Sequence, residues 1–152
     1  MWWTACTMMM SPQEIDMMVP LCAVPLMWAA ITDLRKRIIP DWTWIAILLI
    51  GSASAFLLPY PTPAQRIAGF LLPGVCLLLL AMKCGGVGGG DIKLTAAMGF
   101  SFGLNALALI LFFALPPACI YGAATRQRSV PLAVFLCIGF FAYAGVLYIV
   151  GF

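Results

Sequence analysis

Long apolar runs, each ended by charges or a turn, restrict the fold of this chain more than any other feature. They cover residues 17–32, 42–58, 67–82, 92–122 and 132–152. A helix needs about 20 apolar residues to cross the ~30 Å core of a bilayer. The run from 92 to 122 would be about 47 Å long as one helix, so we expect a break near Ser101 to Asn105. The pattern predicts an all-α polytopic membrane protein with about six transmembrane helices, the fourth of them short.

Composition supports this class and excludes others. Hydrophobic residues make up 64% of the chain and charged residues only 9%, whereas a soluble domain carries roughly a quarter. The chain has no histidine, which excludes histidine-based triads and H-E-x-x-H zinc sites. Its six cysteines form no C-x-x-C pair, and most lie in apolar runs, where cysteine acts as a small hydrophobe.

We therefore expect a single membrane-embedded domain over residues 1–152, in contact with lipid and without metal, cofactor or nucleic acid. Residues 1–32 contain no Lys or Arg, so the start lacks the basic region of a cleavable signal peptide. Two tryptophans near the beginning favour the headgroup level of the bilayer. We interpret residues 1–16 as an interfacial N-terminal segment.

The basic residues predict an orientation. If the N-terminus is outside, seven of the eight Lys and Arg residues fall in or beside cytoplasmic loops, and only Arg66 falls outside. Short cytoplasmic loops are rich in Lys and Arg. The seven are Arg35, Lys36, Arg37, Lys83, Lys93, Arg126 and Arg128. We expect a multi-pass protein of the cytoplasmic (inner) membrane with its N-terminus outside.

Three aspartates then reach the same cytoplasmic boundary. Asp33 ends the first span, Asp41 opens the second and Asp91 opens the fourth. Acids within or beside spans are costly and usually mark function. Simpler explanations exist for each: Asp41 and Asp91 could cap helices, and Asp33 could offset the basic residues that follow it.

Two carboxyl groups held at one depth can catalyse hydrolysis without metal, histidine or serine. Repulsion between like charges leaves the close pair with one proton. The ionised member can then take a proton from water while the protonated member polarises a scissile carbonyl. The glycines before Asp91 allow a tight bend and close approach of a substrate strand.

Residues 88–94 read Gly-Gly-Gly-Asp-Ile-Lys-Leu, and residues 33–41 begin with Asp33 and end in Ile-Pro-Asp. Together with residues 130–136, these segments resemble the type IV prepilin leader peptidases, a family of aspartyl proteases. The first is similar to the family's Gly-x-Gly-Asp-x-Lys-Leu signature. Residues 33–41 resemble its Asp-to-Ile-Pro-Asn/Asp motif, and residues 130–136 are similar to a looser third motif that here lacks Gly-Pro. The likeness covers roughly residue 19 to the C-terminus.

The resemblance implies Asp33 and Asp91 as catalytic residues of an endopeptidase. It would remove the short basic leader of a type IV prepilin, pseudopilin or Flp-type precursor at the cytoplasmic face. By the same likeness, we expect substrate-binding or loop-flexibility roles for Pro40, Gly88, Gly89, Gly90 and Lys93. Full-length relatives have paired C-x-x-C motifs and N-methyltransferase activity. This sequence leaves no room for that segment, so we expect a peptidase-only form.

Other functions stay open at this point. A lipoprotein signal peptidase is another small membrane aspartyl protease, but its active site would lie at the outer face. A cation- or proton-coupled transport protein could use the three aspartates as an oxygen-rich site. Such transporters tend to place the site near the midplane between repeated halves, and no internal repeat is evident. A purely structural membrane subunit is the third alternative.

Overall fold

The computed structural model describes residues 12–84, 88–125 and 131–150, which form helices and contain no strand. The all-α prediction is therefore confirmed for this part of the chain. Of the predicted interfacial segment 1–16, residues 1–11 lie outside the described residues, and the remainder begins the first helix. The helices are α2 (Pro12–Lys36), α3 (Asp41–Leu57), α4 (Pro63–Cys84), α5 (Gly89–Thr125) and α6 (Leu132–Val150).

Four of these helices are long and apolar enough to cross a membrane, so the predicted count of six spans is not confirmed. The four candidate segments are Met17–Lys36, Pro63–Lys83, Gly89–Gly122 and Leu132–Ile149. Helix α3 is apolar but has 17 residues, about 26 Å at 1.5 Å per residue. The count also differs from six because α5 is one element here, although its backbone is interrupted at Gly103.

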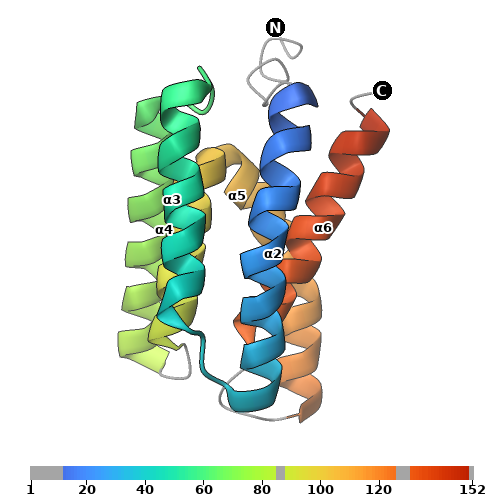
Figure 1. The fold of residues 1–152 in the computed structure, drawn as a ribbon. Helices are drawn as coiled ribbons and strands as arrows, with labels where there is room; N and C mark the ends of the chain where they lie inside the picture. Colours follow the sequence, from blue (N-terminus) through green and yellow to red (C-terminus); the bar gives the residue numbers. More distant parts are fainter. Residues whose placement is uncertain (1–11, 85–87, 126–130, 151–152) are drawn as a thin grey trace, which may run out of the picture.

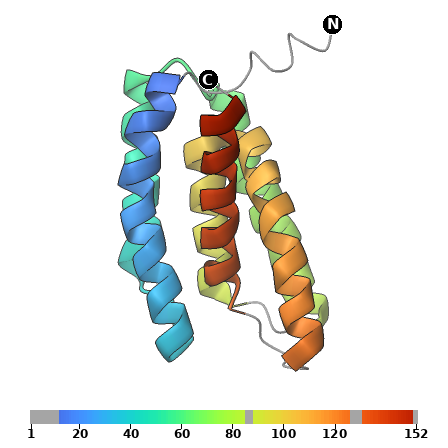
Figure 2. The ribbon, with the colours of Figure 1, turned by 90° about the vertical axis from the view of Figure 1, so that its right-hand side faces the viewer.

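The interruption in α5 is at Gly103, inside the range where the sequence predicts a break. Its φ of 81° and ψ of 167° are not helical, and glycine adopts this region without the steric cost of a Cβ. A Cβ at this position would also lie 2.9 Å from the Cβ of Pro61. Beyond the break, α5 runs back toward the end of the bundle at which it began (Figures 1 and 2).

This reversal gathers several helix ends at one end of the bundle. The end of α2, both ends of α5, and the beginnings of α3 and α6 all lie there, at the bottom of Figure 1. We call it the basic end, because Arg35, Lys36 and Lys83 lie at the ends of α2 and α4 on this side. Helix α2 begins, and α6 ends, at the opposite end (Figure 1).

Small residues let the helices approach closely. A Cβ on Gly69 of α4 would collide with the carbonyl of Gly99 in α5, and a Cβ on Gly99 would collide with that of Gly69. Such contacts are typical of helices packed in membranes. Ser101 of α5 donates a hydrogen bond of 2.9 Å to the carbonyl of Ile47 in α3. The first part of α5 is thus held between α3 and α4.

At the opposite end of the bundle, hydrogen bonds from Arg66 of α4 join this helix to α3 and to the connection between the two helices. It is the one basic residue that the sequence places outside the cytoplasmic loops, and its exposed fraction is only 3%. Its Nε donates to the carbonyl of Pro61 (2.9 Å), and its Nη1 donates to the carbonyl of Gly51 (2.9 Å) and to Ser54 Oγ (3.0 Å). The buried charge is therefore compensated by hydrogen bonds, which burial requires.

Candidate active site

Asp33 lies in the last turn of α2, with its side chain turned into the bundle. Only 6% of the residue is exposed, although Arg35, Lys36 and Arg37, which follow closely, are exposed. The helix ends here because Arg37 adopts a positive φ of 52°, while its N–H still donates to the carbonyl of Asp33 (2.9 Å). The positive charge of Arg37 is close enough to interact with the Asp33 carboxyl group.

Asp91 lies in the first turn of α5 and is equally buried, at 7% exposed. Its backbone N–H donates to the carbonyl of Gly88 (3.1 Å), and its own carbonyl accepts a bond from Thr95 Oγ1 (2.8 Å). The carboxyl group folds back over Gly88, where an added Cβ would lie 3.1 Å from Asp91 Oδ2. Asp91 is therefore a first-turn residue that faces the interior, and Gly88 leaves room for its side chain.

The structure places Asp33 and Asp91 at the same end of the bundle. The two carboxyl groups are close enough for their charges to interact. The backbone N–H of Ala133, at the beginning of α6, lies within reach of both. N–H groups in the first turn of a helix have no partner within the helix and favour negative charge nearby. Three helix ends thus converge on one pair of acids.

Each carboxyl group also keeps one oxygen without a hydrogen bond. Within the described residues, Asp33 Oδ2 and Asp91 Oδ1 are buried side-chain oxygens that have no partner. Buried polar atoms without a partner are uncommon and call for an explanation. A shared proton, a water molecule or a substrate carbonyl would each satisfy them, and all three belong to the chemistry of an aspartyl dyad.

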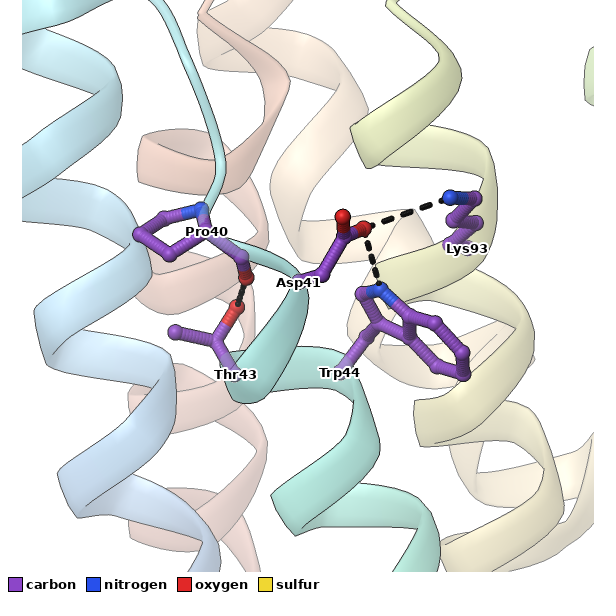
Figure 3. Close-up of polar contacts among 5 residues, drawn as sticks. All are labelled: Pro40, Asp41, Thr43, Trp44 and Lys93. Carbon is purple, nitrogen blue, oxygen red and sulfur yellow. Dashed lines mark hydrogen bonds and ion pairs between the residues drawn. The ribbon is translucent and has the colours of Figure 1, made fainter.

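Asp41 is placed differently from the other two acids. It is the first residue of α3, exposed to solvent, and accepts hydrogen bonds from Trp44 Nε1 (2.9 Å) and Lys93 Nζ (3.2 Å), as Figure 3 shows. These contacts lower the pKa of Asp41 below its ordinary value, the indole bond contributing most. Asp41 does not cap its helix: the N-cap is Pro40, whose carbonyl accepts bonds from the Thr43 N–H (3.1 Å) and Oγ1 (2.7 Å).

The other predicted site residues surround the start of α5. Lys93 pairs with Asp41 rather than with Asp91, and its ammonium group lies 5.4 Å from the centroid of the Trp44 ring. Gly88 adjoins the Asp91 carboxyl group, Gly90 packs against Ile39, and an added Cβ on Gly89 would meet no atom within 4 Å. Among the described glycines only Gly103 has a positive φ, so close approach is what Gly88 and Gly90 provide.

Ala133 is a neighbour of Asp33 and Asp91 that the sequence did not indicate. It follows Pro131 in the third motif, but a backbone N–H leaves no trace in residue type. Only the position of Pro131 just before an apolar run signals a helix start there. Val130 of the same motif lies outside the described residues. Within the described part of the chain, no group of three or more His, Cys, Asp or Glu residues could hold a metal ion.

Known proteins that are similar in sequence to this chain include two peptidases. The chain is 38% identical over 125 residues to a "Prepilin leader peptidase/N-methyltransferase" of Bacillus subtilis, covering 75% of this chain and 49% of the relative. It is 30% identical over 115 residues to a "Preflagellin peptidase" of Methanococcus maripaludis, covering 72% of this chain and 45% of the relative. The chain thus spans about half the length of these relatives. No solved structure matches it.

The family match covers more of the chain than either relative does. The model of the type IV leader peptidase family matches residues 21–150, which include all three motifs and both buried aspartates. Together with the apolar helices, this match makes the protein a multi-pass membrane protein. The chain belongs to the type IV leader peptidase family.

Proposed function

We propose that this protein is an intramembrane aspartyl endopeptidase with Asp33 and Asp91 as its catalytic pair. The observation that carries the proposal is the burial of these two acids at one end of the bundle, close enough for their charges to interact, each with one oxygen that no described residue satisfies. One carboxylate takes a proton from water, and the water oxygen attacks the scissile carbonyl carbon. The protonated carboxyl group donates to the carbonyl oxygen. The C–N bond then breaks, and the new amine receives a proton from the dyad.

The substrate that we propose is a prepilin-like precursor with a short basic leader, of the pilin, pseudopilin or Flp type. The names of the two relatives, a prepilin and a preflagellin peptidase, support leader removal. Methyl transfer is a separate activity in the name of the Bacillus relative. This sequence has no C-x-x-C pair, and we propose that its residues carry the peptidase chemistry alone.

For the membrane arrangement, we propose six crossings with the N-terminus outside and the dyad at the cytoplasmic face of the inner membrane. Helices α2, α3, α4 and α6 would each cross once, and α5 twice, on either side of Gly103. Residues 89–102 span only about 21 Å as a helix, so water could reach their cytoplasmic end. The gathering of Arg35, Lys36 and Lys83 at the basic end supports the orientation.

The experiment that tests this function is cleavage by the purified protein. Prepilin, pseudopilin and Flp-type precursors are incubated with it in detergent, and the products are sequenced by mass spectrometry. We expect one cut after the basic leader of at least one precursor, with no added methyl group. Cleavage that persists in an Asp33→Asn/Asp91→Asn double variant would come from a contaminant and would remove the support for this dyad.

A further inference from the structure

The start of α5 is contacted on both sides of Asp91 by the short segment that precedes and begins α3. One residue before Asp91, Gly90 packs so closely on Ile39 that a Cβ there would lie 2.9 Å from the Ile39 Cβ. Two residues after Asp91, Lys93 forms an ion pair of 3.2 Å with Asp41. The segment 39–41 therefore braces the turn that carries Asp91.

The polar side of this brace is a three-residue cluster (Figure 3). Asp41 Oδ1 accepts bonds from both Trp44 Nε1 and Lys93 Nζ, and the Lys93 ammonium group also lies over the Trp44 ring. Trp44 is one turn beyond Asp41 on α3, so α3 supplies both an anion and an aromatic face to a single cation. The ion pair with Asp41 and the cation–π contact with Trp44 together restrict both the position and the orientation of the Lys93 ammonium group.

Stability alone does not account for this cluster. The side chains of Lys93 and Asp41 are 53% and 71% exposed, and ion pairs at such positions contribute little to folding. Their location is more informative. The first turn of a helix frays easily, and Asp91 lies in that turn with a buried side chain that must face Asp33. Holding the first turn of α5 in place would therefore fix the distance and orientation of the Asp91 carboxyl group relative to that of Asp33.

We propose that Asp41 and Lys93, supported by Trp44, are positioning residues that hold the first turn of α5 so that Asp91 faces Asp33. The segment 33–41 would then do two things: its first residue is one member of the dyad, and its last orients the other. The consequence for cleavage rests on the proposed function. The consequence for geometry does not, so the two can be tested separately.

The geometric test measures the approach of positions 33 and 91 without any substrate. The six native cysteines are replaced by alanine, and Asp33→Cys and Asp91→Cys are introduced together. The rate at which a short bifunctional thiol reagent joins the two cysteines then reports how often they face each other. Asp41→Asn or Lys93→Met should slow this reaction up to about fivefold, the effect expected from an exposed pair.

Charge exchange makes this test specific. Lys93→Asp alone places two acids together and should slow cross-linking about tenfold, whereas Asp41→Lys/Lys93→Asp should recover most of the rate. Lys83→Met is the matched control, because Lys83 is an exposed lysine at the same end of the bundle. Unchanged cross-linking in Asp41→Asn and Lys93→Met, or no recovery in the exchanged pair, would overturn the proposal.

The same substitutions in the protein with both aspartates intact separate positioning from substrate contact. A positioning role lowers kcat with little change in KM, and the exchanged pair restores it. A raised KM that the exchange does not restore would mean that Lys93 binds substrate, which would also overturn the proposal. If no precursor is cleaved at all, the proposed function fails while the cross-linking result stands.

Discussion

The carboxyl group of Asp91, in the first turn of α5, lies close enough to that of Asp33, in the last turn of α2, for their charges to interact. One end of the bundle buries both acids, whereas the third aspartate, Asp41, stays in solvent and pairs with Lys93. The three acids, which the sequence predicts at one boundary, therefore differ in environment, and we expect them to differ in role.

The first prediction concerns these three acids. Asp33→Asn and Asp91→Asn should each lower the cleavage rate by about a hundredfold to ten-thousandfold, because Asn keeps the shape but not the proton chemistry. Asp41→Asn should stay within about fivefold of the unsubstituted protein. Rates are measured on one precursor at matched protein abundance. An Asp41→Asn variant as inactive as Asp91→Asn would favour a cation site built from all three acids.

The second prediction compares three adjacent glycines. Gly90→Ala should lower activity about tenfold, because its Cβ would press on Ile39 and displace the turn that carries Asp91. Gly88→Ala should also lower it, since its Cβ would meet the Asp91 carboxyl group, whereas Gly89→Ala should cost least because its Cβ points into open space. Equal losses in all three would show that general flexibility matters, not close approach. Gly86, a natural further comparison, lies outside the described residues.

The third prediction is that Arg66 stabilises the fold at the end of the bundle away from the dyad. Arg66→Met would leave the carbonyl of Pro61 without its donor from Arg66, at a cost of about 1–3 kcal/mol for a buried group left unsatisfied. The carbonyl of Gly51 would lose one donor but keep its bond from Ser54 Oγ (2.7 Å). We expect a clearly lower thermal unfolding temperature in detergent, with Arg66→Lys restoring only part of it. Arg35→Met, at an exposed position, is the control. An unchanged unfolding temperature in Arg66→Met would contradict a stabilising role for Arg66.

The fourth prediction tests orientation with single cysteines in a cysteine-free protein. An impermeant maleimide applied to intact cells should label Thr62→Cys, at the end that we place outside, and should label Lys36→Cys only after the cells are opened. Both positions are exposed to solvent in the structure. The reverse pattern would move the dyad to the outer face and refute cleavage on the cytoplasmic side.

The fifth prediction is that chelators leave cleavage unchanged. The proposed chemistry needs two carboxyl groups and water, and the described residues contain no cluster suited to a metal ion. Activity is measured after dialysis against EDTA and again with added divalent cations. Loss of activity that one particular cation restores would exclude the dyad acting without metal.

Much of this architecture could be predicted from sequence because it depends on local properties. Apolar length predicts helices, glycine and proline predict their interruptions, and the break in α5 occurs at Gly103, within the predicted range. Asp33 and Asp91 could be paired because each ends or begins an apolar run, and runs of similar length bring alternate ends to one depth. The family motifs around both acids pointed to the same pair.

Tertiary structure alone decided which contacts these residues make. Their positions at the start of an apolar run do not by themselves show that Asp41 and Asp91 differ in burial. Helix α3 leaves Asp41 in solvent beside Lys93, while convergence with α2 and α6 buries Asp91. For the same reason, the sequence did not predict that the Ala133 N–H lies near the two acids or that Arg66 is buried. Residue type determines which interactions a side chain can form. Its partners, however, lie on helices far apart in the chain, and the packing of those helices determines which partners it contacts.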